Sequence, residues 1–250
     1  MMQGFAGRVA IVTGSGQGIG EAIARRLASG GAYVVLNDVM AERVERAAAE
    51  IQEAGHQASY HVSDIATGEG ADHLVEHAMN TYGRLDILVN NAGIAKDRYL
   101  AKMTDEEWDS VIRVNLSAQF LTCRAAARIM IDRKYGRIIN IASRAWLGGP
   151  GQANYSASKG GVVSLTRTLA LELGKFQITA NAVAPGLIDT PLFRNLQPEV
   201  QERLAKTVPV QRVGTPEEVA DAVAFFADDG AGYLNGQLLY VCGGRSVGSY

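Results

Sequence analysis

The stretch VAIVTGSGQGIG, residues 9–20, joins a short β-branched run to a turn rich in glycine. An apolar run of this kind, followed at once by a turn, predicts a strand that is buried on both faces. Helical spacing of apolar residues follows over residues 18–30, and residues 33–36 form a second apolar run. The three segments predict a βαβ unit, and therefore a mainly parallel sheet covered by helices.

The same alternation continues through the rest of the sequence. Further helices are expected over residues 41–54, 67–82, 104–133, 154–173 and 216–227, and further strands over residues 58–62, 85–89, 136–141, 178–183 and 238–241. Thr104 and Thr215 each begin a capping box, because a glutamate follows three residues later. We find no linker or repeat, so we expect one α/β domain over residues 1–250. The connection over residues 186–214 is too long for an ordinary loop. We expect it to cover the substrate, with plain packing of its apolar side chains as the alternative.

Composition excludes several classes of partner. Lys and Arg number 24 against 26 Asp and Glu, so the net charge of -2 offers no broad positive field for nucleic acid or an anionic membrane. No apolar run approaches the roughly 20 residues that span a bilayer, and we expect a cytoplasmic protein. Cys123 and Cys242 form no CxxC pair, so the sequence does not support a disulfide framework or a zinc cluster. His73 and His77 lie four residues apart without a third ligand, so we expect no metal site.

The turn after the first strand has the composition of a phosphate-binding loop. Gly14, Gly18 and Gly20 allow sharp turns and the close approach of a ligand, with Gln17 and Ile19 between them. The helix that begins here would point its first N–H groups at an anion such as a pyrophosphate. The spacing G-x-x-x-G-x-G is neither the strict G-x-G-x-x-G motif nor a Walker loop. By itself this pattern also fits a purely structural turn.

An acidic residue after the second strand indicates which dinucleotide would bind. Asp38 follows Gly20 by 18 residues, where a carboxylate can accept hydrogen bonds from a ribose and would repel a 2′-phosphate. Gln17 stands where an arginine could have neutralised that phosphate, and Asn37 precedes Asp38, so the sequence indicates no nearby cation. We therefore expect NAD rather than NADP. The alternative is that Asp38 only caps the helix that begins near Ala41.

A tyrosine and a lysine are candidates for proton transfer. Tyr155 and Lys159 lie four residues apart at the start of a predicted helix, so both side chains emerge on one face. An ammonium about 4 Å from a phenol, at an effective dielectric of about 20, is worth about 4 kcal/mol, or roughly three pKa units. Desolvation of the phenolate would oppose this effect. Ser143, which ends a predicted strand, could hydrogen-bond the substrate oxygen, and no hydrolase motif surrounds it.

Taken together, these features resemble the short-chain dehydrogenase/reductase family over nearly the whole chain. The matching positions are Thr13 to Gly20, Asp38, Asp64, Ile65, Asn90 to Gly93, Asn115, Ser143, Tyr155 to Lys159, Pro185, Gly186 and Thr190. The resemblance implies a single-domain, Rossmann-like, doubly wound sheet of seven parallel strands in the order 3-2-1-4-5-6-7. It also implies a homotetramer.

The resemblance further implies a role for each matched residue. Tyr155 would be the general acid/base, Lys159 would lower the pKa of Tyr155 and bind the nicotinamide ribose, and Ser143 would polarise the reacting oxygen. Asn115 would hold a relay water. The remaining positions would contact the cofactor: Asp64 and Ile65 at the adenine, Asn91 and Gly93 along its length, and Ile188 and Thr190 at the carboxamide.

We therefore expect an NAD-dependent oxidoreductase that interconverts a secondary alcohol and a ketone by hydride transfer. The stretches 90–115 and 148–155 look especially like 3-oxoacyl-carrier-protein reductases, and such a reductase, using NADPH or NADH, is the alternative. A nucleotide-binding protein without turnover is a second alternative. The intact set of Ser143, Tyr155 and Lys159 argues against it.

Overall fold

Short apolar runs form the strands of one parallel sheet in the computed structural model, which describes residues 4–247. The strands are β1 (Val9–Thr13), β2 (Tyr33–Asp38), β3 (Ala58–Val62), β4 (Ile87–Asn90), β5 (Gly136–Ile141), β6 (Ile178–Pro185) and β7 (Leu238–Val241). Their order is β3-β2-β1-β4-β5-β6-β7, and every neighbouring pair is parallel. The expected sheet of seven parallel strands in the order 3-2-1-4-5-6-7 is confirmed.

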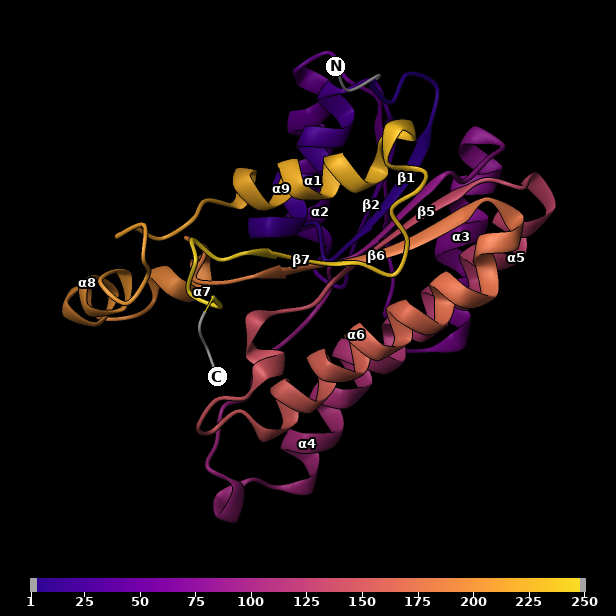
Figure 1. The fold of residues 1–250 in the computed structure, drawn as a ribbon. Coiled ribbons are helices and arrows are strands. Elements are labelled where there is room, and N and C mark those ends of the chain that lie inside the picture. The colour runs from indigo at the N-terminus through magenta and orange to yellow at the C-terminus, as the bar shows by residue number, and fades with distance from the viewer. Residues whose placement is uncertain (1–3, 248–250) are drawn as a thin grey trace.

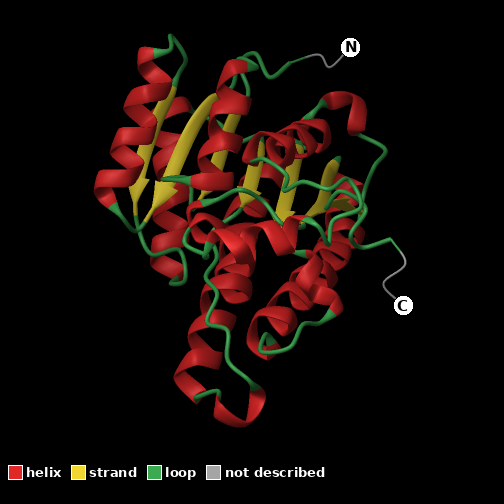
Figure 2. Ribbon diagram, turned by 90° about the vertical axis from the view of Figure 1, so that its left-hand side faces the viewer, coloured by secondary structure: helices red, strands yellow, loops and turns green. Residues whose placement is uncertain are grey.

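Helices cover both faces of this sheet (Figures 1 and 2). The helices that form the two layers are α1 (Gly18–Ser29), α2 (Ala41–Glu53), α3 (Gly68–Tyr82), α5 (Ala118–Arg133), α6 (Ala153–Leu173) and α9 (Pro216–Ala227). Helix α4 (Asp105–Ile112) packs against α6. Apolar side chains of α1, α2 and α9 form one core with the sheet, and those of α3, α5 and α6 form a second core on the opposite face. Burial on both faces explains why the central strands are apolar throughout rather than alternating.

The expected helix over residues 104–133 is interrupted. The structure divides it into α4, a π-helical turn over Arg113–Ser117, and α5. Thr104 caps α4 and Thr215 caps α9, each in a complete capping box as predicted. Apolar spacing alone does not reveal one extra residue in a turn. Turns of this kind occur often at functional sites, and this one contains Asn115.

The connection over residues 186–214 contains two short helices. These are α7 (Pro191–Arg194) and α8 (Pro198–Ala205), and each begins with proline, which suits the first turn of a helix. A backbone bridge between Ile188 and Gly214 closes the base of the connection. In Figure 1 both helices lie beyond the ends of β6 and β7.

All carboxyl ends of the strands lie at one edge, because every strand runs in the same direction. The strand order reverses between β1 and β4: β2 and β3 lie on one side of β1, and β4 to β7 lie on the other. In open α/β sheets, ligands bind outside the carboxyl ends of the strands at such a switch point. Residues after β1, β2, β4, β5, β6 and β7 are therefore brought to one place. Among residues 4–247, no helix has the length and apolarity needed to cross a membrane.

Candidate active site

The glycine-rich turn after β1 is packed tightly against the end of β4. A Cβ atom on Gly20 would lie 2.2 Å from the carbonyl oxygen of Gly14 and 2.5 Å from Nδ2 of Asn91. That Nδ2 atom donates hydrogen bonds to the carbonyl oxygens of Thr13 and Gly14, at 3.0 and 2.9 Å. A Cβ atom on Gly14 would likewise lie 2.7 Å from Cα of Ala92. These two glycines and Asn91 therefore fix the shape of the turn.

The same turn leaves a helix N-terminus open. Gln17 is the N-cap residue of α1, and its side chain makes no capping hydrogen bond. Gly18 has a φ of 59°, which favours glycine, and a Cβ there would meet nothing closer than Cδ of Pro191, at 3.7 Å. The first N–H groups of α1, with their positive partial charge, suit a phosphate group. Thr190 lies on the same side, with its Cγ2 3.8 Å from that Cβ position.

Asp38 faces the glycine-rich turn, as predicted. It is the last residue of β2, and its Oδ2 atom accepts a hydrogen bond of 3.1 Å from the N–H of Gly16. Its Oδ1 atom accepts from the N–H of Met40, which is itself the N-cap residue of α2. The alternative that Asp38 is the N-cap of this helix is therefore wrong. The carboxylate therefore lies between the glycine-rich turn and the start of α2.

Two arginines of α2 lie at the glycine-rich turn beside Asp38, although the sequence indicated no cation that could neutralise a 2′-phosphate. Helix α2 lies over the turn. Nη2 of Arg46, in this helix, donates a 2.9 Å hydrogen bond to the carbonyl oxygen of Gly16. Arg46 also pairs with Glu21 and Glu50, and hydrogen bonds to these carboxylates raise its pKa. Arg43, one turn earlier, has its Cβ 2.8 Å from where a Gly16 Cβ would stand. Arg43 and Arg46 lie three residues apart on a predicted helix, so the sequence could have indicated that both lie on one face of it.

Lys159 is held at the end of β5. Its Nζ atom donates a 2.7 Å hydrogen bond to the carbonyl oxygen of Ile141 and lies 5.7 Å from the ring centroid of Tyr155. Ser143 follows β5 and accepts a 3.1 Å hydrogen bond from the N–H of Ala145 through its Oγ atom. The structure brings Ser143, Tyr155 and Lys159 together, as the sequence predicts.

Within the protein alone, the expected lowering of the tyrosine pKa does not occur. Burial raises the pKa of Tyr155, a side-chain hydrogen bond with Ser143 lowers it, and the negative charge of Asp97 raises it. Burial also lowers the pKa of Lys159 to about 8. Spacing in the sequence reveals the neighbouring cation but not how deeply the phenol is buried. Desolvation is the larger effect here.

Asn115 joins the π-helical turn to the tyrosine helix. Its Oδ1 atom accepts from the N–H of Ile94, and its Nδ2 atom donates to the carbonyl oxygen of Ile94 and to Oγ of Ser158. The side chain is fully buried, and its polar atoms have protein partners. A Cβ on Gly93 would lie 3.3 Å from Oδ1 of Asn115 and 3.6 Å from Nζ of Lys159. Gly93 therefore lies against both polar groups.

Three further predicted positions have other partners in the structure. The carboxylate of Asp64 accepts a 3.1 Å hydrogen bond from Nη1 of Arg113. Ile65 is 5% exposed and Ile188 is 6% exposed, and both side chains pack in the hydrophobic cores. Their apolar side chains are therefore committed largely to packing, and Asp64 alone of the three presents an exposed polar group.

Sequence reasoning missed Asp97, which affects Tyr155. Nε2 of Gln152 donates a 2.9 Å hydrogen bond to Oδ2 of Asp97 and holds this carboxylate beside the start of α6. Asn154, which is fully buried, accepts from the N–H of Tyr155 and donates to the carbonyl oxygens of Lys96 and Glu107. The loop between β4 and α4 is thereby fastened to the tyrosine. No motif in the sequence joins these distant segments.

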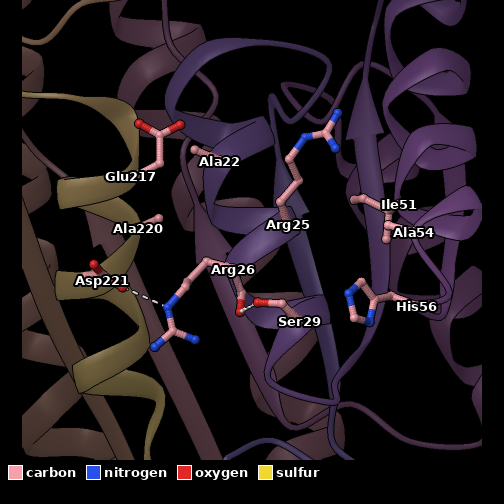
Figure 3. Close-up of a pocket in the computed structure, with 10 residues that line it drawn as sticks. All are labelled: Ala22, Arg25, Arg26, Ser29, Ile51, Ala54, His56, Glu217, Ala220 and Asp221. Carbon is pink, nitrogen blue, oxygen red and sulfur yellow. Dashed lines mark hydrogen bonds and ion pairs between the residues drawn. The ribbon is translucent and has the colours of Figure 1, made fainter.

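A surface pocket lies away from these residues, between α1, α2 and α9 (Figure 3). Its volume is about 360 Å³, and Ala22, Ile51 and Ala220 are among its apolar lining residues. At its edge, Nε of Arg26 donates a 2.7 Å hydrogen bond to Oδ1 of Asp221. None of the predicted site residues lines it. No cluster of three or more potential ligand side chains that could hold a metal ion is found within residues 4–247.

Known proteins resemble this chain along almost its entire length. A family model described as enoyl-(acyl carrier protein) reductase matches residues 14–246. The (2S)-[(R)-hydroxy(phenyl)methyl]succinyl-CoA dehydrogenase subunit BbsD of Thauera aromatica is 46% identical over 98% of this chain and 98% of its own. The 3-oxoacyl-acyl-carrier-protein reductase of Chlamydia trachomatis is 41% identical over 96% of this chain and 97% of its own.

A solved structure agrees with these matches. The crystal structure of levodione reductase superposes with a TM-score of 0.94, at 35% sequence identity, and covers 98% of this chain and 100% of that chain.

Proposed function

The chain belongs to the short-chain dehydrogenase/reductase family of oxidoreductases, and we propose that it interconverts a secondary alcohol and a ketone with NAD. The observation that carries this proposal is the meeting of Ser143, Tyr155 and Lys159 at the carboxyl edge of the sheet, next to an open glycine-rich turn. A hydroxyl, a phenol and an ammonium in this arrangement can hold a substrate oxygen and exchange a proton with it.

Tyr155 supplies the proton in the direction of ketone reduction. Burial keeps its pKa raised, so the phenol is protonated at neutral pH and Oη can donate to the oxygen as a hydride adds to the carbonyl carbon. The reverse direction needs the phenolate, which the ammonium of Lys159 and the hydroxyl of Ser143 would both stabilise. Both Nδ2 donors of Asn115 are bonded to protein, so a relay water would have to donate to an oxygen acceptor of this residue.

A nicotinamide dinucleotide fits the residues present and would supply the hydride. The uncapped start of α1, with Gly18 at a positive φ, would bind the pyrophosphate. Asp38 would accept hydrogen bonds from the adenosine ribose and would repel a 2′-phosphate, which supports NAD. Lys159, beside Gly93, would bind the nicotinamide ribose, and the family resemblance implies that Thr190, which lies near Gly18, would contact the carboxamide.

We infer an acyl thioester as the substrate class. Both curated relatives described above carry an acyl thioester or acyl carrier in their names. The second candidate function is reduction of 3-oxoacyl groups on a carrier protein with NADPH, which the chlamydial relative favours by its name. Asp38 opposes NADPH, whereas the nearby Arg43 and Arg46 would tolerate its extra phosphate.

One assay tests the proposal. Absorbance of the reduced nicotinamide is followed while the purified protein acts on an acetoacetyl thioester and on matched neutral ketones, with NADH and NADPH in turn. We expect oxidation of NADH with kcat/KM at least tenfold above the value with NADPH. A clear preference for NADPH favours the second candidate, and no oxidation of either cofactor with any ketone contradicts both.

The family resemblance also leads us to propose a homotetramer that works in the cytoplasm. Large apolar side chains are exposed on α5, α6, α9 and β7, and a second copy of the chain could cover them: Phe120, Leu171, Phe225 and Leu239. Light scattering of the purified protein measures the assembly, and a monomeric mass would contradict the tetramer.

A further inference from the structure

A second cationic residue directly follows Ser143, one of the proposed proton-transfer residues. Arg144 follows Ser143 in the chain and opens a short 3₁₀ helix, η3 (Arg144–Leu147). Its Nε atom is buried and has no hydrogen-bond partner within residues 4–247. A buried donor without an acceptor costs free energy. The Nε donor of Arg144 is therefore left for an acceptor that the described part of the chain does not supply.

The turn after β7 brings another arginine to the same edge. Nε1 of Trp146 in η3 donates a 2.7 Å hydrogen bond to Oη of Tyr240 in β7, so the two elements are packed together. Arg245 lies four residues after the end of β7 and is partly buried. Burial and then the positive charge of Arg144 lower the pKa of Arg245. Arg245 therefore follows β7 at the carboxyl edge of the sheet, within range of the positive charge of Arg144.

The segment that we assign to substrate binding lies over this turn. A Cβ on Gly243 would lie 2.6 Å from both Cγ1 of Val208 and Cγ2 of Val210. A Cβ on Gly244 would lie 3.3 Å from Pro209. Close approach of the backbone therefore requires glycine at Gly243. The turn that holds Arg245 therefore packs against the 186–214 connection.

We propose that Arg144, with Arg245 beside it, binds an anionic oxygen group of the substrate while the substrate carbonyl lies at Ser143 and Tyr155. A guanidinium binds a carboxylate or a phosphate through two parallel N–H donors, which fixes orientation as well as position. The substrate is thus a ketone or alcohol that carries a carboxylate, or a phosphate of its thioester carrier. This inference rests on the proposed function, because it places both groups in the same cleft.

Matched substrates separate the two sources of negative charge. One pair comprises 3-oxoacyl thioesters of N-acetylcysteamine that end in a free carboxylate or in its methyl ester, with several chain lengths. The other pair carries the same neutral 3-oxoacyl group on two different thiols. N-acetylcysteamine has no phosphate, whereas coenzyme A has phosphate groups. We expect the wild-type protein to favour the charged member of at least one pair in kcat/KM by about tenfold or more.

Substitution of Arg144 tests whether this side chain causes the preference. Arg144→Gln is expected to raise KM for the favoured charged substrate about tenfold or more, with a smaller change in kcat and little change for the neutral partner. Arg144→Lys should restore part of the preference, because it keeps the charge. Arg167→Gln, which removes an exposed arginine of α6, is the matched control and should leave both values unchanged. An equal loss for charged and neutral substrates would mean a structural role only and would overturn the proposal.

Binding without turnover distinguishes this inference from the proposed function. Calorimetric titration of Tyr155→Phe with the same charged and neutral pairs, in the presence of NADH, measures affinity alone. We expect tighter binding of the charged member, and loss of this difference in Tyr155→Phe/Arg144→Gln. If charge-dependent binding is found but the wild-type protein reduces no ketone, the proposed function fails, whereas binding of the anionic group by Arg144 remains supported. If affinity is independent of charge, this inference is wrong.

Discussion

The ammonium of Lys159 donates a 2.7 Å hydrogen bond to the carbonyl oxygen of Ile141, the last residue of β5. Ser143 follows that residue by two positions, so a single strand end positions both the cation and the serine hydroxyl. Lys159 is only 2% exposed, and burial lowers its pKa to about 8. The positive charge of Lys159, which the proposed chemistry needs, therefore lowers the unfolding free energy of the protein when the side chain is protonated.

That cost should depend on pH. Between about pH 8 and pH 10.5, the ordinary pKa of lysine, the unfolded chain binds more protons at this position than the folded chain, so the unfolding free energy rises with pH. Below pH 8 the buried charge costs about 3 kcal/mol. Lys159→Met removes this term at every pH. The unfolding free energy of the variant minus that of the wild type should therefore fall by about 3 kcal/mol between pH 7 and pH 10.5.

Denaturant unfolding of both proteins across this range measures the difference. The other titrating groups contribute equally to the pH dependence of both proteins. The loss of the hydrogen bond to Ile141 shifts the difference by the same amount at every pH. A difference that stays constant with pH would contradict the burial of a protonated Lys159.

The glycine-rich turn should not tolerate alanine at Gly20. The added Cβ would lie 2.2 Å from the backbone oxygen of Gly14, and backbone cannot move aside as a flexible side chain can. We expect Gly20→Ala to lose on the order of 2 kcal/mol of stability and to weaken dinucleotide binding more than tenfold. Gly160→Ala is the matched control, since its Cβ position in α6 has no other described atom within 4 Å apart from neighbouring residues and the backbone of its own helix. That control should gain about 0.5–1 kcal/mol from helix propensity. Thermal unfolding and NADH fluorescence titration measure both effects, and equal behaviour of the two variants would refute this view of the turn.

Cofactor choice should depend on Asp38 and on the arginine beside the turn. Asp38→Ala removes the charge that would repel a 2′-phosphate and leaves Arg43 in place. We expect kcat/KM with NADPH, relative to NADH, to rise at least tenfold. Asp38→Ala/Arg43→Ala should lose most of that gain. If the single variant keeps the wild-type ratio, the carboxylate does not determine cofactor choice.

The sheet and the central residues could be predicted from the sequence because their signals are local. Strand β1 and its glycine turn are contiguous, and Tyr155 and Lys159 lie on one helix face. The parallel direction of the strands then brings Asp38, Asn91 and Ser143 to one edge. Local patterns of this kind need no knowledge of how distant loops pack.

Features made by packing between distant segments could not be predicted in this way. Asp97 reaches Tyr155 because Gln152 and Asn154 fasten one loop to another. Desolvation determines the direction of the Tyr155 pKa, and spacing does not report burial. The π-helical turn at Asn115 differs from a regular helix by its hydrogen-bond pattern alone, which apolar periodicity does not detect.

The most direct test of the proposed chemistry replaces Tyr155 by phenylalanine. Removal of one hydroxyl leaves the ring and its packing in place, so dinucleotide affinity, measured by fluorescence titration, should change less than threefold. Hydride transfer, followed as loss of nicotinamide absorbance on a ketone that the wild-type protein reduces, should fall at least 100-fold. A Tyr155→Phe variant that binds the dinucleotide and reduces the ketone at the wild-type rate would contradict the central claim.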